Sequence, residues 1–268
     1  MSRVRYRKNL RDLERGDDAF DQDLPHRVRM IRCVYETDAE VAEAVVPKPL
    51  EASVGAEVSV SFTSIETPIA PDVTVESRYA TFGVRVDYDS SPGNYLLTEP
   101  TTSEARVLLG RERFGLPAKL AEISFASASG GEVDRVEAQV TRKGVRYLLA
   151  SARRVEDLGP RKFVEHGYCF KAFAGCTAGK GFDQDPQLVR LDCHHDFSQV
   201  WRLEGEIELA DSPFDPVSDL PVRRIIEFEY AEGTLKRVGR VLRPVPGDWL
   251  LPFLHQRYDE PDVLGVEI

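Results

Sequence analysis

The sequence has little cysteine, no long apolar run and no excess of positive charge, and each shortage excludes a class of protein. Its 268 residues include four cysteines (Cys33, Cys169, Cys176 and Cys193), which show no tight pairing. No apolar stretch approaches the ~18 residues that cross a bilayer. The N-terminus has charge but no hydrophobic run behind it, so we expect no signal peptide. These shortages together predict a cytoplasmic protein with reduced thiols and no membrane contact.

The charge balance argues against nucleic acid as a partner. The formal net charge is −10, and phosphate binding needs a basic stripe. Basic residues gather only at positions 3–11, and an acidic cluster follows at 17–23. We interpret residues 1–24 as a solvated, partly mobile arm. No linker or internal repeat divides the rest, so residues 25–268 are expected to form one domain.

Alternation of apolar and polar residues predicts a mainly β fold. In "EVSVSFTSI" (57–65) and "WRLEGEIEL" (201–209), every second residue is apolar, as in strands with one wet face. Such strands form antiparallel sheets. Similar patterns mark further strands at 25–36, 78–89, 133–142, 145–152, 188–197 and 223–230.

Two short helices interrupt the strands, and the remaining segments read as irregular. Thr37 with Glu40, and Thr101 with Glu104, fit the S/T-x-x-E capping box. Pro47 ends the first helix, and the second is expected to run to about residue 113. The segment 157–187, rich in Gly, Phe and Tyr, is expected to lack regular structure, and a short helix is expected after the turn-rich segment near the C-terminus.

The run "DCHHD" (192–196) raises the question of a metal site. In a strand Cys193 and His195 share one face, in phase with Leu191, so we interpret them as core neighbours. No second ligand group stands at a metal-binding spacing, so we expect no metal. Cys–His nucleophilic catalysis stays open, because the sequence does not place a histidine beside a given thiol. No glycine-rich phosphate loop is present, and we expect no cofactor.

The segment "GRERFGLPAKLAEISF" (110–125) contains a lysine, Lys119, within an apolar run. In a regular strand, Lys119 shares a face with Ala121, Ile123 and Phe125. Burial there lowers the pKa of an amine, and a neutral amine can attack a carbonyl. The alternative is that Lys119 reaches water while its stem covers apolar surface, and the pattern alone favours this alternative.

Four segments, in order along the chain, resemble the acetoacetate decarboxylase family. They are "YETDAEVAEAVVPKPLE" (35–51), "VES" (75–77), "GRERFGLPAKL" (110–120) and "PVSDLPVRRII" (216–226). The resemblance implies an antiparallel β cone or barrel around an apolar pocket, a homo-oligomer and a small carbonyl substrate. It also implies that the first lysine of a Lys-Lys pair, activated by its surroundings, forms a Schiff base with a β-keto acid.

The sequence departs from the family at the nucleophile. Aligned through Pro117, that position holds Ala118, and only the second lysine remains, as Lys119. If the register is kept, Lys119 faces away from the pocket, because neighbours in an extended segment diverge. A bulge after Pro117 would instead turn Lys119 inward.

The other family positions are partly kept. Glu76 matches a pocket glutamate and is a candidate acid or base. The second pocket glutamate falls near Ser61. The substrate-binding arginine falls on Val28, and a shift of one residue would supply Arg29. The resemblance thus implies catalytic roles for Lys119 and Glu76. It implies substrate-binding roles for Arg29, Ser61, Arg111 and Ala118.

Three functions follow as hypotheses. The first is an enzyme that acts on a keto acid or related carbonyl compound through an imine on Lys119, by decarboxylation or by an aldol or dehydration reaction. The second is an isomerase, cyclase or hydrolase of the same fold that uses Glu76 without an imine. The third is a non-catalytic protein that binds a small apolar ligand.

Overall fold

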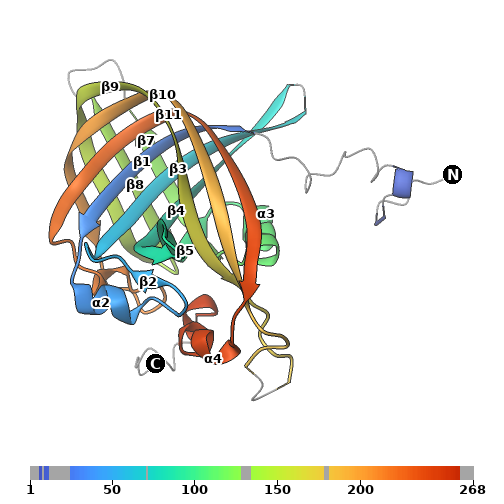
Figure 1. Ribbon diagram of the computed structural model, residues 1–268. Coiled ribbons are helices and arrows are strands. Elements are labelled where there is room, and N and C mark those ends of the chain that lie inside the picture. The colour runs from blue at the N-terminus through green and yellow to red at the C-terminus, as the bar shows by residue number, and fades with distance from the viewer. Residues whose placement is uncertain are drawn as a thin grey trace.

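The fold is mainly β, with a few short helices, as the alternation predicts (Figure 1). The computed structural model describes residues 6–7, 9–11, 25–70, 72–127, 134–177 and 181–259, so the expected N-terminal arm lies almost wholly outside the described residues. The long strands are β1 (His26–Glu36), β3 (Glu57–Ala70), β4 (Val73–Tyr88), β5 (Ser91–Thr101), β9 (Val145–Lys171), β10 (Gln187–Leu209) and β11 (Arg224–Pro244). The short strands are β2 (Glu51–Ala52), β6 (Ala118–Leu120), β7 (Glu122–Ser127) and β8 (Arg135–Arg142).

The helices are short and lie at the ends of the sheet. They are α2 (Ala39–Ala44), α3 (Glu104–Leu109) and α4 (Gly247–Leu250); a π-helical turn, Gly110–Phe114, continues α3. Single 3-10 turns span Val217–Asp219, Leu251–Phe253 and His255–Arg257. No helix among the described ranges has the length and apolar content to span a membrane.

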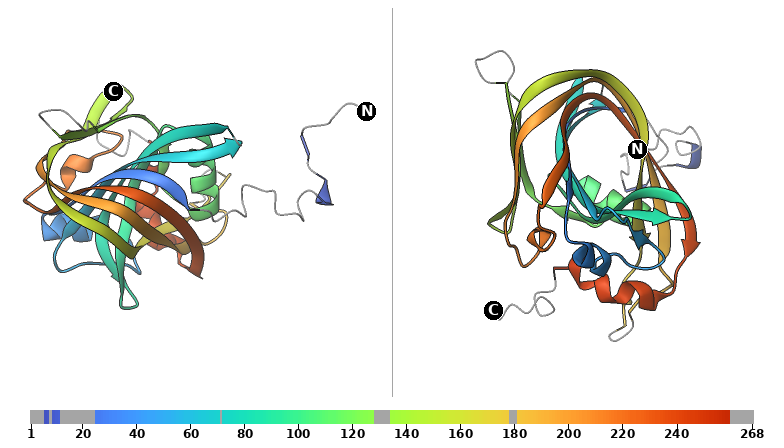
Figure 2. Two further views of the ribbon diagram at one scale, coloured as in Figure 1. Left: turned by 90° about the horizontal axis from the view of Figure 1, so that it is seen from above. Right: turned by 60° about the vertical axis from the view of Figure 1, so that its left-hand side comes forward.

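Seven of the strands close into a cone-like ring. Their order is β5-β4-β3-β1-β11-β10-β9, with antiparallel neighbours throughout. A short parallel pairing of β5 with β9, at Asn94 with Gly167 and Tyr95 with Tyr168, completes the ring. The right-hand view of Figure 2 shows these strands arranged around a common centre. One face of each strand therefore points into the ring and the other points out.

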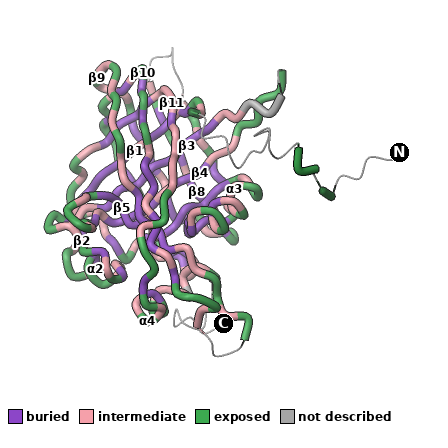
Figure 3. Tube along the Cα trace, turned by 45° about the vertical axis from the view of Figure 1, so that its right-hand side comes forward, coloured by how far each residue is buried: buried purple, intermediate pink, exposed green. Residues whose placement is uncertain are grey.

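A second layer covers part of the outer face. The first half of β9 pairs with β8, and β8 pairs with β7. Apolar residues of these strands, such as Val140 and Leu148, pack with Val60, Phe62 and Phe82 from the outer face of the ring. Figure 3 shows buried residues alternating with more exposed ones along the strands. The ring interior and the space between the two layers are thus separate, because successive side chains of a ring strand point alternately into the ring and toward the second layer.

The segment 157–187 corrects one expectation, because much of it is regular strand. β9 continues to Lys171, and β10 begins at Gln187. Gly159 has a φ of +73°, and the pairing of β9 with β10 shifts register nearby. A bulge of this kind lets a strand pass glycine and proline without ending. The aromatic residues that suggested a loop, Tyr168 and Phe170, are instead buried.

The helix caps also differ from the expected boxes. The residue at the N-terminus of α2 is Asp38, whose side chain makes no capping hydrogen bond. Ser103 caps α3 and accepts a hydrogen bond from the backbone N–H of Arg106 at 3.3 Å. Both helices begin one or two residues later than the motif predicts, because Thr37 and Thr101 are buried in or beside the preceding strands.

Candidate active site

Two neighbouring residues of β6 point to opposite sides of the ring wall. This strand lies parallel to the end of β5, with Ala118 beside Glu99 and Lys119 beside Pro100. Ala118, 1% exposed, packs with Leu191 in a cluster at the inner end of the ring. Lys119, 6% exposed, therefore points away from that cluster, as the family register predicts.

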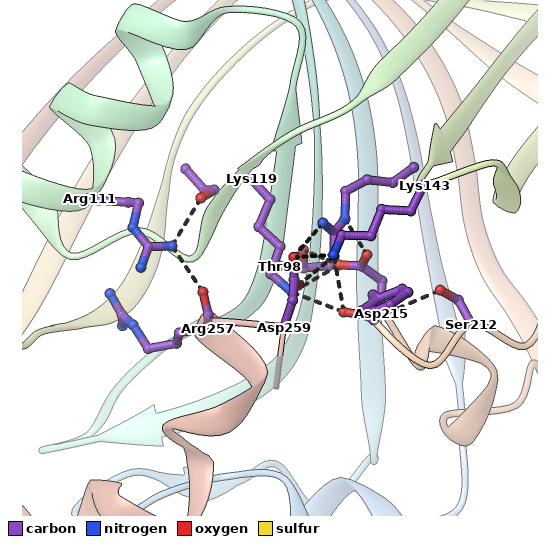
Figure 4. A network of polar contacts seen from close by, with 11 residues as sticks. Thr98, Arg111, Lys119, Lys143, Ser212, Asp215, Arg257 and Asp259 are labelled. Carbon is purple, nitrogen blue, oxygen red and sulfur yellow. Dashed lines mark hydrogen bonds and ion pairs between the residues drawn. The ribbon is translucent and has the colours of Figure 1, made fainter. Parts of the chain in front are cut away.

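The amine of Lys119 lies in a buried group of charges (Figure 4). Its Nζ donates to the carbonyl oxygen of Phe214 at 2.9 Å and lies 2.9 Å from Asp259 Oδ1 and 3.3 Å from Asp215 Oδ1. Arg142 binds the same two carboxylates, with its Nε 2.6 Å from Asp215 Oδ2. The two cations and two anions balance each other, so the group is stable as a unit and each member depends on the others.

The protonation of Asp259 reflects these contacts. Burial alone would raise the pKa of this carboxyl group, but hydrogen bonds from Arg142 and Lys119 lower it to about 2. The carboxylate is therefore ionised at neutral pH and holds the ammonium group of Lys119. An ammonium group has no lone pair with which to attack a carbonyl.

The ring encloses a small cavity, and a larger one adjoins it. The inner cavity, of about 50 Å³, is lined by residues from all seven strands of the ring. The outer cavity, of about 410 Å³, lies between α3 and the long β3–β4 hairpin. Tyr79, Leu235 and Arg237 line both. We call the two together the ring cavity.

His195 is the most unusual group in the ring cavity. It is 3% exposed and stacks on Phe163 with ring centroids 4.6 Å apart. Among the described residues, neither ring nitrogen has a hydrogen-bond partner, and Nε2 lies 3.9 Å from Glu165 Oε2. Burial lowers the pKa of His195 to about 4, although Glu165 opposes this. The imidazole is therefore neutral at pH 7 and carries one N–H.

Further polar groups surround His195. Asn94 also lines the cavity, and its buried Oδ1 has no hydrogen-bond partner among the described residues. Glu165 is paired with Arg32 at 3.2 Å. Buried polar atoms are normally paired, so unpaired atoms around one cavity are typical of a binding site.

A net positive charge stands where the inner and outer cavities meet. The carboxylate of Glu99, 0% exposed, lies 3.1 Å from Arg237 and 3.2 Å from Arg106. Arg106 also stacks over Tyr79, with its guanidinium carbon 3.6 Å from the ring centre. Burial would lower the pKa of Arg237, but the charge of Glu99 raises it well above its ordinary value. Two cations and one anion leave one positive charge, which suits an anionic substrate group.

The structure separates the residues that the sequence suggested. Ser61 lines the inner cavity, where its Oγ lies 2.7 Å from Thr81 Oγ1. Ala118 lies at the inner end of the ring, as described above. Glu76 and Arg29 do meet, at 3.3 Å, with Ser64 Oγ donating to Glu76 at 2.6 Å.

The Glu76–Arg29 pair lies on the outer face of the ring. Arg29 packs against Phe125 of β7, and both charged side chains are 38% exposed. Hydrogen bonding from Ser64 is the main reason that the pKa of Glu76 is lowered. Arg111, which the family resemblance suggested as a substrate-binding residue, donates hydrogen bonds to the carbonyl oxygens of Ala118 and Arg257. It lines none of the cavities.

The sequence did not single out Glu99, Glu165 or Arg237. Each belongs to a strand, and its inward direction depends on bulges and on the pairing of distant strands. The alternation along the strand did predict that Leu191, Cys193 and His195 share one face. The prediction that they are core neighbours is confirmed for Leu191 and His195, which are buried. Within the described ranges no group of residues suits a metal ion. Asp192 of the same run is buried and binds Arg240 at 2.5 Å, so it is not a surface residue.

Comparison with known proteins gives a consistent result. A family model described as acetoacetate decarboxylase (ADC) matches residues 13–245. An acetoacetate decarboxylase of Paraburkholderia phytofirmans is 26% identical over 203 residues, which cover 73% of this chain and 76% of that protein. One from Clostridium botulinum is 23% identical over 213 residues, covering 76% and 82%.

Solved structures show the same fold. Acetoacetate decarboxylase from Legionella pneumophila has a TM-score of 0.67 at 18% identity, and the match covers 82% of this chain and 88% of that one. The enduracididine biosynthesis enzyme MppR, complexed with pyruvate, has a TM-score of 0.67 at 16% identity, covering 86% and 95%. With the family model spanning most of its length, the chain belongs to the acetoacetate decarboxylase family.

Proposed function

We propose that this chain is an enzyme that moves a proton at the carbon beside the carbonyl group of a small keto acid, without forming an imine. The reaction takes place in the ring cavity. The observation that carries the proposal is the division at β6: Ala118 packs with Leu191, which lines the inner cavity, whereas the Lys119 amine points away and is held by two carboxylates. Among the described residues, no lysine lines the ring cavity.

The binding step uses charge. The carboxylate of the keto acid lies against Arg237, in the field of the Arg106–Glu99–Arg237 group, which has one net positive charge. The carbonyl end then reaches the inner cavity, where His195 and Asn94 have unpaired polar atoms. A volume of about 50 Å³ admits the reacting end of the substrate, and the wider outer cavity holds the remainder.

The chemical step divides the work between two residues. Glu165 takes a proton from the carbon beside the carbonyl, and the electron pair of the broken C–H bond forms the C=C bond of an enolate. The neutral imidazole of His195 donates its N–H to the enolate oxygen. A neutral imidazole whose pKa is lowered suits this role, because it polarises the carbonyl without losing its proton first. Return of the proton, or attack on a second carbonyl compound, completes the reaction.

Exchange of hydrogen for deuterium measures this step directly. We expect the protein to exchange the hydrogens beside the carbonyl of pyruvate or 2-oxobutanoate in D₂O, followed by proton NMR. Glu165→Gln should slow the exchange by about 100-fold or more, because general-base catalysis commonly contributes that much. Glu76→Gln is the matched control and should leave the rate nearly unchanged, since Glu76 lies on the outer face. The opposite result for the two variants would contradict the proposal.

Reduction with borohydride separates this proposal from the imine hypothesis. Wild-type protein incubated with pyruvate or acetoacetate should give no reduced adduct by mass spectrometry. Ala118→Lys places an amine on the cavity side of β6 and should give an adduct at residue 118, which shows that the assay detects an imine. An adduct on Lys119 of the wild-type protein would restore the Schiff-base mechanism.

A further inference from the structure

We infer that the chain has a second binding site, outside the ring cavity, for a small monocarboxylate with an apolar body. The site is a cavity of about 370 Å³ between the end of β5, the segment 215–220 and the C-terminal turns. Its lining shares Leu96 with the inner cavity and no residue with the outer one. It is therefore a separate compartment, independent of the chemistry proposed for the ring.

The walls of this compartment suit an apolar molecule. They include aromatic and aliphatic side chains from several elements: Phe82, Leu97, Phe170, Val217, Leu220 and Phe253. A volume of this size, with mostly apolar walls and a few polar groups, is typical of sites for small molecules. The polar groups define which small molecule fits.

Arg257 is the cation of the compartment. Its Nη1 donates to the carbonyl oxygen of Phe170 at 2.9 Å, but its Nε is buried without a hydrogen-bond partner among the described residues. No carboxylate in that part of the chain forms an ion pair with it. Burial, and the like charge of Arg111, lower the pKa of Arg257. A cation that is largely withdrawn from water and has no counter-charge is costly, and an anionic ligand that pairs with the buried Nε of Arg257 reduces that cost.

The acids of the compartment do not supply the counter-charge. Asp215 lines it, but its two oxygens already bind Lys119 and Arg142. Asp219 also lines it and is exposed, with no ion pair among the described residues. One unmatched cation and one exposed acid favour a ligand with a single negative charge at the Arg257 end. A second carboxylate near Asp219 would be repelled.

Titration calorimetry with octanoate tests the site. Octanoate should bind saturably with one molecule per chain, and octylammonium and octanedioate should bind at least about tenfold more weakly, since a charge-assisted hydrogen bond is lost or a charge is repelled. Arg257→Gln should weaken octanoate binding by about tenfold or more. Asp219→Asn should strengthen it. Near-ultraviolet circular dichroism checks that each variant is folded.

Further variants distinguish the compartment from other sites. Leu220→Trp fills the cavity and should abolish octanoate binding even if Arg257→Gln fails to fold. Arg237→Gln, in the ring cavity, should leave octanoate binding unchanged while it impairs the proposed exchange reaction. The inference is overturned if octanoate does not bind, or if Arg237→Gln abolishes binding while Leu220→Trp does not. It is also overturned if binding appears only after residues 260–268 are removed, because the chain's own end would then be the occupant.

Discussion

At the residue scale, the direction of Ala118 and Lys119 determines what chemistry the ring cavity supports. The lysine is a structural group in this chain: it neutralises Asp215 and Asp259 together with Arg142. Its burial, which suggested a reactive amine, is instead the result of ion pairing. A buried lysine and a reactive lysine share one sequence pattern, and only the partners tell them apart.

Lys119→Met tests this structural role. The change leaves the buried Asp215 with Arg142 alone, and the partly buried Asp259 with Arg142 and the exposed Lys143, so we expect the free energy of unfolding to fall by about 3–5 kcal/mol. Urea unfolding followed by circular dichroism measures it. Lys143→Met is the matched control, because Lys143 is about half exposed and lies 3.6 Å from Asp259; its effect should stay below about 1 kcal/mol. Equal effects of the two changes would contradict the role assigned to Lys119.

At the element scale, the last turn of the described chain is attached to the ring wall by charge. The 3-10 turn His255–Arg257 leads to Asp259, which binds Lys119 of β6 and Arg142 of β8. Arg111, in the π-helical turn that continues α3, adds a hydrogen bond to the carbonyl oxygen of Arg257. The C-terminal turns therefore depend on the ionised form of one carboxyl group.

This dependence predicts an effect of pH. The pKa of Asp259 is lowered from 3.8 to about 2, so its contribution to stability is complete above pH 3.8 and is lost as the pH falls toward 2. Asp259→Asn should cost about 2 kcal/mol at pH 7. The difference between wild type and Asp259→Asn, measured by urea unfolding at pH 7, 4 and 3, should shrink only below about pH 4. A difference that is constant to pH 3 would show that the charge of Asp259 does not matter.

The sequence predicted the positions of the strands better than it predicted how the strands pair. Alternation identified most strands because one face of each is buried, as with Val60 and Phe62 in β3. It missed the second half of β9, where glycine and proline are accommodated by a bulge. Local composition cannot show a bulge, since the partner strand defines it.

The same limit applies to the candidate site. For Lys119, the register along "GLPAKL" predicts that the side chain faces away from the pocket, whereas a bulge after Pro117 would turn it inward, and adjacent residues alone leave both directions open. The residues Glu99, Glu165, His195 and Arg237 come from four strands that are far apart in the chain. No spacing in the sequence therefore predicts that they lie together. The motif "VES" singled out Glu76, but it predicted neither the contact of Glu76 with Arg29 nor the face on which the pair lies.

At the scale of the whole molecule, closure of the ring depends on a small residue. β5 meets β9 at Asn94 and Tyr95, beside Gly93. A Cβ atom added at Gly93 would stand 2.7 Å from the carbonyl oxygen of His166 and 2.7 Å from the Tyr168 ring. Both distances are below van der Waals contact, so a side chain at this position forces the two strands apart.

Gly93→Ala should therefore destabilise the protein by about 1–3 kcal/mol. It should also speed amide hydrogen exchange in β5 and in the second half of β9, measured by mass spectrometry. Gly55→Ala is the control, because its added Cβ would meet a flexible side chain, that of Glu57, at 3.2 Å. Exchange that is unchanged in both strands would mean that the β5–β9 contact does not hold the ring closed.

The homo-oligomer expected from the family resemblance stays a prediction, which light scattering can check.

The length of β9 has a consequence for how the molecule unfolds. One strand of 27 residues pairs with β8 in its first half and closes the ring in its second. The ring and the outer layer cannot come apart at a loop between them, because the continuous backbone of β9 belongs to both. Loss of the ring therefore removes the support of the outer layer, and the two are expected to melt in a single cooperative transition.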